Sequence, residues 1–378
     1  MPERIPEWVT AWSASLGGAI GATLPSDTTL RQFVRLNAGG SGLRIRLTNL
    51  ADAAIVLNGV AVGVAAADGS ALGPSVRVSR EGSTRIPVPS GECVVSDPVA
   101  LEVGAFDRLR ISLTAEGLVP VSSHDFANAI VYIADGDHLD DGPAAFRPWR
   151  TSWAWVDAVE VRDSGLQGTV VALGDSITDG AGSDFDSDTR WTDQLARRML
   201  ALPAGDPRRR AVANAGIGGN TVCSIGNAIV GVNGLERFDR DVLQLAGVRE
   251  LVVFHGTNDV FVGTPADEIV AALAEMANRA RAAGIRPFVA TLAPRVGGLD
   301  WDYEREGRRA AVNAWIRRQD VYDDVLDFER ILATPDGKRI RPDLDADHTH
   351  PGSRGYAALA DGIDLGIFAS RPTGRERP

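Results

Sequence analysis

The hydrophobic pattern of this chain changes once, near residue 165, and this change restricts the fold more than any other feature of the sequence. Before it, short apolar runs are separated by turn residues, and several runs alternate by twos. In the segment 43–47, Leu-Arg-Ile-Arg-Leu, the apolar and the arginine side chains would point to opposite faces of a strand. After it, short apolar runs alternate with longer helical stretches. Two domains of different fold class are therefore expected.

Residues 1–163 are expected to form an all-β domain. Short runs rich in β-formers, separated by turns and without any long helical periodicity, are typical of a β-sandwich or jelly roll. The clearest strands are predicted at 30–36, 43–47, 53–64, 75–78, 84–88, 109–113 and 129–133. Three tryptophans, Trp149, Trp153 and Trp155, are interpreted as packing between the domains, and the alternative is an exposed carbohydrate-binding face.

Residues 164–378 are expected to form an α/β domain with a doubly wound parallel sheet. Apolar runs that alternate with helical stretches indicate βαβ crossovers. Strands are predicted at 170–173, 211–214, 250–254, 287–291 and 325–328, and helices at 191–200, 235–245, 266–283, 303–318 and 353–368. Ligands of such sheets bind at the carboxyl ends of the strands, so the residues that follow each strand are the first candidates for a site.

The first predicted strand of this domain is followed by Gly174-Asp175-Ser176. A serine at a strand end, where a helix begins, is well placed as a nucleophile, and its own N–H group can face a bound carbonyl oxygen. The alternative is structural: Ser176 caps the helix and Asp175 orders the turn. Because residue 178 is threonine, the segment is not the Gly-x-Ser-x-Gly elbow of α/β-hydrolases.

Two further loops follow predicted strands and offer hydrogen-bond donors. The loop 214–221 contains Gly218 and Gly219, whose N–H groups can approach an oxyanion or a phosphate without steric hindrance. Its spacing does not match the dinucleotide fingerprint, and an ordinary tight turn is the alternative. The amide of Asn258, after the third strand, can donate to developing negative charge, although the same residue can form an Asx-turn.

The segment 345–352, near the C-terminus, supplies a candidate base. Histidine titrates near neutrality, and a carboxylate can fix its tautomer and stabilise its charged form. Asp347 and His350 lie three residues apart and could pair in this way. The alternatives are an acidic surface loop, or a metal site that adds Asp345 and His348, although no second cluster of ligands completes such a site.

Taken together, these segments resemble the motif blocks of the SGNH hydrolase superfamily, also called the GDSL esterases. The blocks are Gly174-Asp175-Ser176, Asn-Ala-Gly-Ile-Gly-Gly-Asn at 214–220, Gly-Thr-Asn-Asp at 256–259 and Asp-His-Thr-His-Pro at 347–351. The resemblance covers residues 167–370 and implies a flavodoxin-like doubly wound sheet. Weaker similarity of the segments 8–13 and 44–49 links the first domain to the β-domain of a bacterial two-domain subgroup.

The resemblance implies roles for five residues. Ser176 matches the nucleophile, His350 the general base and Asp347 the triad acid. The N–H groups of Ser176 and Gly219 and the side-chain amide of Asn258 match the oxyanion hole. Gly219 fits the spacing of the family better than its neighbour at 218, and the extra histidine at 348 is interpreted as structural.

The function implied is that of a serine esterase that cleaves carboxylic esters through an acyl-enzyme, with no metal or organic cofactor. The resemblance favours short acyl groups such as acetyl, and the expected partner is a small-molecule or carbohydrate ester. Two alternatives stay open. One is an acyltransferase that uses the same acyl-enzyme, and the other is a carbohydrate-binding protein with a degenerate hydrolase domain.

Charge and composition argue against other partners. The chain has 39 Lys and Arg against 50 Asp and Glu, so its formal charge is 39 − 50 = −11, and no basic tract suggests a nucleic-acid partner. No apolar run reaches the roughly 18 residues that a membrane-spanning helix needs. The N-terminus shows no secretory signal, so a cytoplasmic location is expected. The two cysteines, Cys93 and Cys223, predict no disulfide framework, and nothing in the sequence indicates the oligomeric state.

Overall fold

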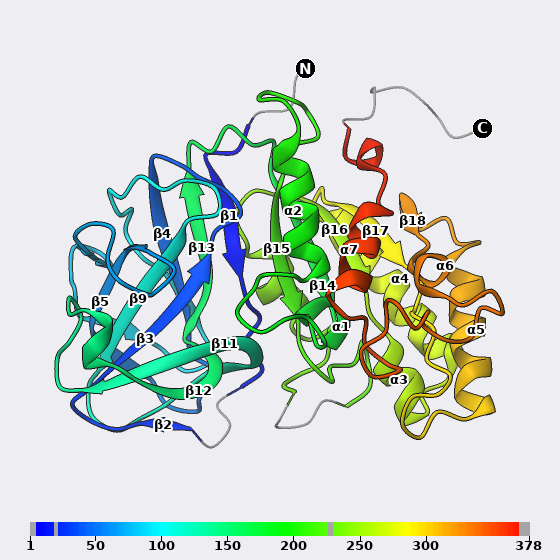
Figure 1. Ribbon diagram of the computed structural model, residues 1–378, viewed down its shortest axis with the longest axis horizontal. Helices are drawn as coiled ribbons and strands as arrows, with labels where there is room; N and C mark the ends of the chain where they lie inside the picture. The colour runs from blue at the N-terminus through cyan, green and yellow to red at the C-terminus, as the bar shows by residue number, and fades with distance from the viewer. Residues whose placement is uncertain (1–4, 19–21, 226–229, 370–378) are drawn as a thin grey trace.

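The computed structural model describes residues 5–18, 22–225 and 230–369. Antiparallel sheets from the first part of the chain lie beside a parallel sheet with helices on both faces, as the blue-to-cyan and the green-to-red ribbons of Figure 1 show. This arrangement confirms the predicted fold class. None of the helices in the described ranges is long and apolar enough to cross a bilayer.

Two antiparallel sheets dominate the N-terminal part. The larger sheet has the order β12-β11-β3-β9-β5-β6, with β7 paired to β5, and the smaller one has the order β1-β13-β4-β8. Their inward-facing side chains share one apolar core that includes Leu30, Ile45 and Leu113. The strands are β1 (Trp8–Ser13), β3 (Thr28–Arg35), β4 (Gly42–Thr48), β5 (Ile55–Ala65), β6 (Val76–Arg77), β7 (Ile86–Val88), β8 (Cys93–Val95), β9 (Arg108–Ala115), β11 (Ser123–Asp135), β12 (Arg147–Ala154) and β13 (Val156–Arg162), and a separate pair joins β2 (Thr23–Leu24) to β10 (Val119–Pro120). A short 3-10 helix, η1 (Pro143–Ala145), precedes β12.

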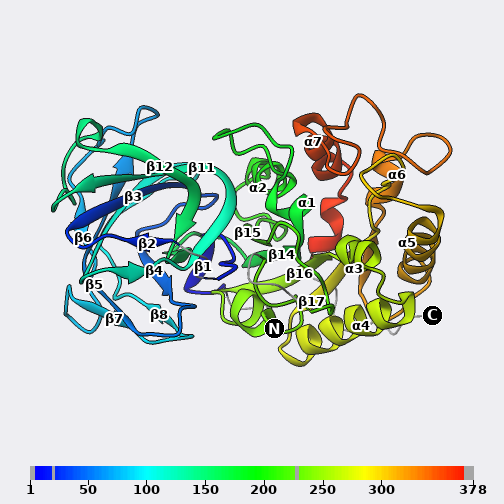
Figure 2. The same cartoon turned by 90° about the horizontal axis from the view of Figure 1, so that it is seen from below.

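The parallel sheet has the strand order β15-β14-β16-β17-β18, which is the flavodoxin-like order. Its strands are β14 (Thr169–Gly174), β15 (Ala211–Gly216), β16 (Val248–Phe254), β17 (Arg286–Ala290) and β18 (Asp324–Leu326). Strand residues alternate between two apolar cores, with Val170 in one and Val171 in the other. Helices therefore cover both faces, and the carboxyl ends of the strands meet at one edge (Figure 2).

The helices of the two faces are distinct. Helices α2 (Trp191–Ala201), α6 (Phe328–Leu332) and α7 (Ser353–Asp361) pack on one face, and α4 (Ala266–Ala282) and α5 (Tyr303–Ile316) pack on the other. Two short helices, α1 (Ser176–Asp179) and α3 (Thr257–Val262), begin directly after β14 and β16. They stand at the edge of the sheet where a site was expected.

Three predicted elements of this part are wrong in extent. The helix expected at 235–245 is only a five-residue π-type turn, η2 (Asp239–Leu243), next to the buried ion pair of Arg237 and Asp241. The helix expected at 353–368 ends at Asp361, and a separate 3-10 turn, η3 (Leu365–Phe368), is capped by Asp364, which accepts from Gly366. The strand expected at 325–328 is shorter as well, because the last of these residues already begins α6.

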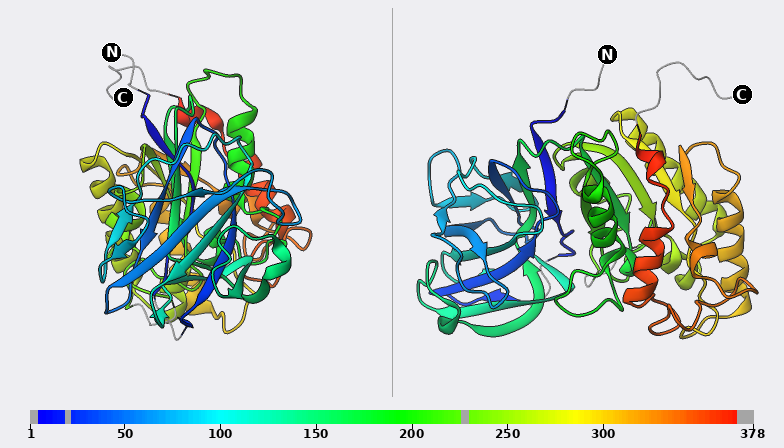
Figure 3. Two further views of the ribbon diagram at one scale, coloured as in Figure 1. Left: turned by 90° about the vertical axis from the view of Figure 1, so that its left-hand side faces the viewer. Right: turned by 45° about the horizontal axis from the view of Figure 1, so that its top comes forward.

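The N-terminal sheets cover the outer edge of the parallel sheet. Strand β1 lies along β15, as the dark-blue and green ribbons in the right panel of Figure 3 show. The side chain of Asn37 pairs with both backbone groups of Val212 on β15, as its amide donates over 2.5 Å and its oxygen accepts over 3.0 Å. A sheet edge leaves unpaired backbone groups, and these contacts satisfy those of Val212, while Ser13 Oγ on β1 donates to the carbonyl of Asn214 over 2.9 Å.

Two of the three tryptophans are buried near this contact. Trp155 is fully buried, and Trp153 packs edge-on against Trp12 with ring centroids 5.1 Å apart. The guanidinium of Arg190, from the C-terminal part, lies 5.4 Å from the Trp153 ring. Trp153 therefore contacts both parts of the molecule, as the packing interpretation expects. Between the parts, β13 ends at Arg162 and β14 begins at Thr169, and the division at residues 163 and 164 stays a prediction.

Replacing Asn37 by alanine removes both hydrogen bonds to the edge of β15 and leaves two backbone groups of Val212 without a partner. We expect the free energy of unfolding to fall by about 1–3 kcal/mol, which urea unfolding followed by tryptophan fluorescence would measure. Asn58→Ala is the matched control, because Asn58 is exposed on β5. Equal stability of the two variants would show that the Asn37 contacts contribute nothing to the junction.

Candidate active site

Ser176 is the first residue of α1 and is separated from the end of β14 by one residue, Asp175. The helix is capped by Asp175, whose carboxylate accepts from the N–H of Ile177 over 3.1 Å, so the structural alternative that Ser176 is the cap is wrong. Ser176 N–H, at the first helical position, has no acceptor within the helix. Burial raises the pKa of Asp175 to about 6, against the lowering effect of its hydrogen bond from Ile177.

Ser176, His350 and Asp347 are joined by two hydrogen bonds. Ser176 Oγ lies 2.8 Å from His350 Nε2, and His350 Nδ1 lies 2.8 Å from Asp347 Oδ2. The second oxygen of Asp347 accepts from the backbone N–H groups of His350 and Thr349 over 2.7 and 3.0 Å. Partial burial alone would raise the pKa of Asp347, but the hydrogen bonds from His350 outweigh it and hold the pKa below its usual value. The carboxylate is therefore charged at neutral pH.

The extra histidine of this loop forms a separate pair. His348 Nδ1 lies 2.7 Å from Asp345 Oδ2, and the side chain is 70% exposed. The spacing of three residues is the same as in the pair of Asp347 and His350. Within residues 5–18, 22–225 and 230–369, no three His, Cys, Asp or Glu side chains are grouped so that they could hold a metal ion.

Gly218 and Gly219 use their N–H groups differently. Gly218 N–H donates to Asp179 Oδ2 over 2.8 Å and is therefore occupied. Gly219 has a φ of +75°, in the left-handed region that favours glycine, and its N–H has no acceptor among the residues that the structure describes. On α3, the side-chain amide of Asn258 donates one hydrogen to the carbonyl of Asn220 over 2.9 Å, which leaves its second hydrogen available.

A buried asparagine, Asn220, organises this region. Its side-chain oxygen accepts from Arg237 Nε over 3.0 Å and lies 3.2 Å from His255 Nε2, and its amide donates to two carbonyls of the segment 230–232. Burial, and then the charge of Arg237, lower the pKa of His255 well below its usual value, so this ring is neutral. The carbonyl of Asn220 in turn accepts from the side-chain amide of Asn258. The position of the Asn258 amide thus depends on a network that the motif blocks identify only in part.

Asp259, next to Asn258, fixes the backbone of the segment 222–224, which follows Asn220 in the chain. Its carboxylate accepts from the backbone N–H groups of Val222, Cys223 and Ser224 over 2.7, 3.1 and 3.1 Å. The side chain is completely buried. Neither Arg237 nor this role of Asp259 was found from the sequence, because most of their partners lie 17 to 63 residues away along the chain.

A histidine from the N-terminal part also reaches the site. His124 on β11 contacts Asp179 Oδ1 through Nε2 over 2.9 Å and the carbonyl of Ser15 through Nδ1 over 2.7 Å. Both ring nitrogens face oxygen atoms, which suits the doubly protonated ring, since a carbonyl can only accept. Burial alone would lower the pKa of His124, but the charge and hydrogen bond of Asp179 raise it above its usual value. Through Asp179, this pair is linked to Gly218.

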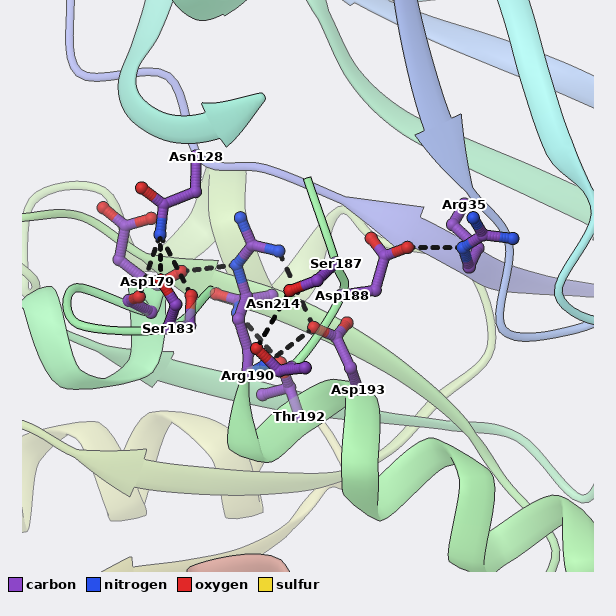
Figure 4. A network of polar contacts seen from close by, with 12 residues as sticks. Arg35, Asn128, Asp179, Ser183, Ser187, Asp188, Arg190, Thr192, Asp193 and Asn214 are labelled. Atoms are coloured by element: carbon purple, nitrogen blue, oxygen red, sulfur yellow. Dashed lines mark hydrogen bonds and ion pairs between the residues drawn. The ribbon is translucent and has the colours of Figure 1, made fainter. Parts of the chain in front are cut away.

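The loop between α1 and α2 is held by other residues of β11. Asn128 donates to the carbonyl of Gly180 over 3.2 Å and to Ser183 Oγ over 3.0 Å. Arg190 donates from Nε to the carbonyl of Asp179 and from Nη2 to the carbonyl of Ala127, both over 2.6 Å. Figure 4 shows these side chains converging between β11 and the start of α2. The helix that begins with Ser176, and the loop after it, are thus held by groups of the N-terminal part.

Comparison with known proteins identifies a family. Residues 172–358 match the family described as GDSL-like Lipase/Acylhydrolase. A search of curated proteins finds no match.

Three solved structures illustrate the similarity. A GDSL-like lipase from Bacteroides thetaiotaomicron is 21% identical, with 53% of this chain and 87% of that chain covered and a TM-score of 0.38. Est24, a carbohydrate acetylesterase from Sinorhizobium meliloti, is 13% identical, with 51% and 94% covered and a TM-score of 0.41. The acetyl xylan esterase AlAXEase is 23% identical, with 51% and 96% covered and a TM-score of 0.40.

Replacing His124 by glutamine removes the charge that faces Asp179 and changes how stability depends on pH. Since the pKa of His124 is raised in the folded protein, the charged pair stabilises it fully below about pH 6.5, the pKa of an unperturbed histidine, and this stabilisation is lost as the pH rises through the higher folded pKa. Urea unfolding of both proteins from pH 5.5 to 9 would measure the effect. We expect the wild type to lose its advantage over His124→Gln across this range; a constant difference would contradict the charged pair.

Proposed function

Residues 172–358 belong to the GDSL-like lipase/acylhydrolase family, and we propose that this carboxylic ester hydrolase works through a serine nucleophile, Ser176. The observation that carries the proposal is the continuous hydrogen-bonded chain from Ser176 through His350 to Asp347, with both links at 2.8 Å. Such a chain supplies a nucleophile, a general base and a carboxylate that orients the base. This series of hydrogen bonds argues against the alternative of a degenerate hydrolase domain with only a binding role.

In the proposed reaction, His350 Nε2 accepts the proton of Ser176 as Oγ attacks the ester carbonyl carbon. Asp347 holds Nδ1–H and stabilises the imidazolium that forms. The tetrahedral intermediate collapses with cleavage of the bond to the alcohol oxygen, and His350 returns its proton to that oxygen. Water then attacks the acyl-enzyme with His350 as base, which releases the carboxylic acid and restores Ser176.

The oxyanion would be bound by the N–H groups of Ser176 and Gly219 and the second amide hydrogen of Asn258. Three observations support this assignment: Ser176 is first in its helix, Gly219 N–H has no acceptor in the described part of the chain, and Asn258 uses one of its two hydrogens. The N–H of Gly218 is excluded from this role, because it already donates to Asp179. Donors that are fixed in place before reaction stabilise the developing charge most effectively.

We propose short acyl groups, acetyl above all, on small-molecule or carbohydrate alcohols as the substrates. The likeness of the motif blocks to GDSL esterases supports this choice. No group in the proposed mechanism requires a cofactor, since each proton has a residue of this chain as donor or acceptor.

The central test is hydrolysis of 4-nitrophenyl esters from acetate to palmitate by the wild type and by Ser176→Ala, followed by release of 4-nitrophenol. We expect turnover that is highest for acetate and absent in Ser176→Ala, because the variant lacks the attacking oxygen. Asp347→Asn should lower kcat by about 10⁴-fold, since the imidazole loses the carboxylate that orients and stabilises it. Activity equal in the wild type and in Ser176→Ala would remove Ser176 from the mechanism.

The oxyanion assignment is tested by Asn258→Ala. We expect kcat to fall by about 10²–10³-fold, because one donor to the transition-state oxyanion is lost. Steady-state kinetics on 4-nitrophenyl acetate would measure it, with Val262→Ala, an exposed position on the same helix, as control. A loss no larger than that of the control would mean that Asn258 only supports the turn.

A further inference from the structure

Arg295 lies in the loop that follows β17, beside the segment that carries Asp347 and His350. The carbonyl of Arg295 accepts from Gly298 N–H over 3.0 Å, which closes a tight turn. A Cβ atom added to Gly298 would lie 3.1 Å from that carbonyl, 3.1 Å from the carbonyl of His348 and 2.8 Å from Thr349 Oγ1. The Arg295 turn therefore packs directly against the histidine loop.

The guanidinium of Arg295 is held between two aromatic rings. Its Cζ lies 4.9 Å from the ring centroid of Phe261 and 5.0 Å from that of Trp301. Phe261 is on α3, three residues after Asn258, so the clamp is one helical turn from a proposed oxyanion donor. Cation–π contacts of this kind fix a guanidinium in place without using its N–H donors.

Those donors are unused. In the described part of the chain, the Arg295 side chain makes no hydrogen bond or ion pair, and its Nε atom is buried without an acceptor. Burial lowers the pKa of Arg295, while the charges of Asp175 and Asp347 act in the opposite direction, which indicates that the cation lies in the field of the site. An unsatisfied buried donor costs free energy unless a ligand or water completes it.

Arg305 provides a contrast on the other side of the clamp. Its Cζ is 5.2 Å from the Phe261 ring, but its Nε donates to the carbonyl of Phe261 over 2.9 Å and its Nη1 donates to Asp302 over 2.5 Å. Arg305 thus spends donors on groups of the protein, whereas in the described part of the chain Arg295 spends none. Arg305 serves as a matched control.

We propose that Arg295 binds a carboxylate on the alcohol part of the substrate, so that the preferred substrates are acetyl esters of acidic alcohols such as hydroxy acids or acidic sugars. The inference rests on the proposed function. The proposed mechanism explains why the carboxylate is placed on the alcohol part and not on the acyl part. His350 protonates the departing alcohol, and the turn that begins with Arg295 packs against the loop that holds His350. The planar fork of a guanidinium matches a carboxylate, which can accept two parallel hydrogen bonds.

The test compares charged and neutral acetyl esters of the same shape. The substrates are 3- and 4-acetoxybenzoate and their methyl esters, and the proteins are the wild type, Arg295→Met, Arg295→Lys and Arg305→Met. We expect Arg295→Met to lower kcat/KM for an acetoxybenzoate by about 10- to 100-fold and to change that for its methyl ester by less than about threefold. Arg295→Lys keeps the charge and should restore part of the preference, whereas Arg305→Met should leave the ratio of the two esters unchanged.

Two results would overturn the inference. One is an equal change, or no change, for the charged and neutral esters in Arg295→Met when circular dichroism shows a folded variant. The other is that Arg295→Met loses activity only on substrates with a charge on the acyl part. Hydrolysis of mono-4-nitrophenyl glutarate, which carries a carboxylate on its acyl part, would then fall, and hydrolysis of the neutral 4-nitrophenyl valerate would not.

Failure of the proposed function would look different. Calorimetric binding of 3- and 4-hydroxybenzoate to Ser176→Ala does not depend on turnover, and we expect it to weaken when Arg295→Met is added. Binding that depends on Arg295, together with a wild type that hydrolyses none of these esters, would contradict the serine mechanism and leave the anion site in place. Binding that is insensitive to Arg295 would contradict the anion site.

Discussion

The carboxylate of Asp179 connects the elements on which the rest of the site depends. Asp179 is the last residue of the helix that begins with Ser176. Its Oδ2 accepts from Gly218 N–H, and its Oδ1 pairs with His124 from the N-terminal part. A buried charge is tolerated only when it is paired and its remaining oxygen is hydrogen-bonded, and both conditions are met. The position of the glycine loop therefore depends on a histidine from an antiparallel sheet.

The parallel sheet supplies the other half of the geometry. Because β15, β14 and β16 are neighbours, the loops that follow them place Gly219, Ser176 and Asn258 at one edge. Strand β15 stands at the border of this sheet, where Asn37 pairs with the backbone of Val212 and Ser13 on β1 donates to the carbonyl of Asn214. The N-terminal part thus supports the candidate site in two ways: it covers the sheet edge at β15, and residues of β11 contact the helix that begins with Ser176 and the loop after it.

Much of this could be predicted from local patterns. The parallel strands were recognised from apolar runs, and the pairing of Asp347 with His350 from a spacing of three residues within one loop. The contacts that were missed join distant parts of the chain: His124 with Asp179 at 55 residues and Arg237 with Gly174 at 63. The helix expected at 235–245 failed for the same reason, since a buried arginine that donates to carbonyls of two neighbouring strands decides the local backbone there.

The sequence by itself determined the fold class, most of the secondary structure, and the chain order of the residues proposed as nucleophile, oxyanion donors and acid–base pair. These depend on short-range periodicity and on the chemistry of single residues. Only the tertiary structure decided that Gly218 spends its N–H on Asp179 and that Asp175 caps the helix in place of Ser176. It also decided that Arg295 lies between two rings with no hydrogen bond or ion pair to the described residues. The reason is physical: hydrogen-bond satisfaction and burial depend on all atoms nearby, whatever their separation along the chain.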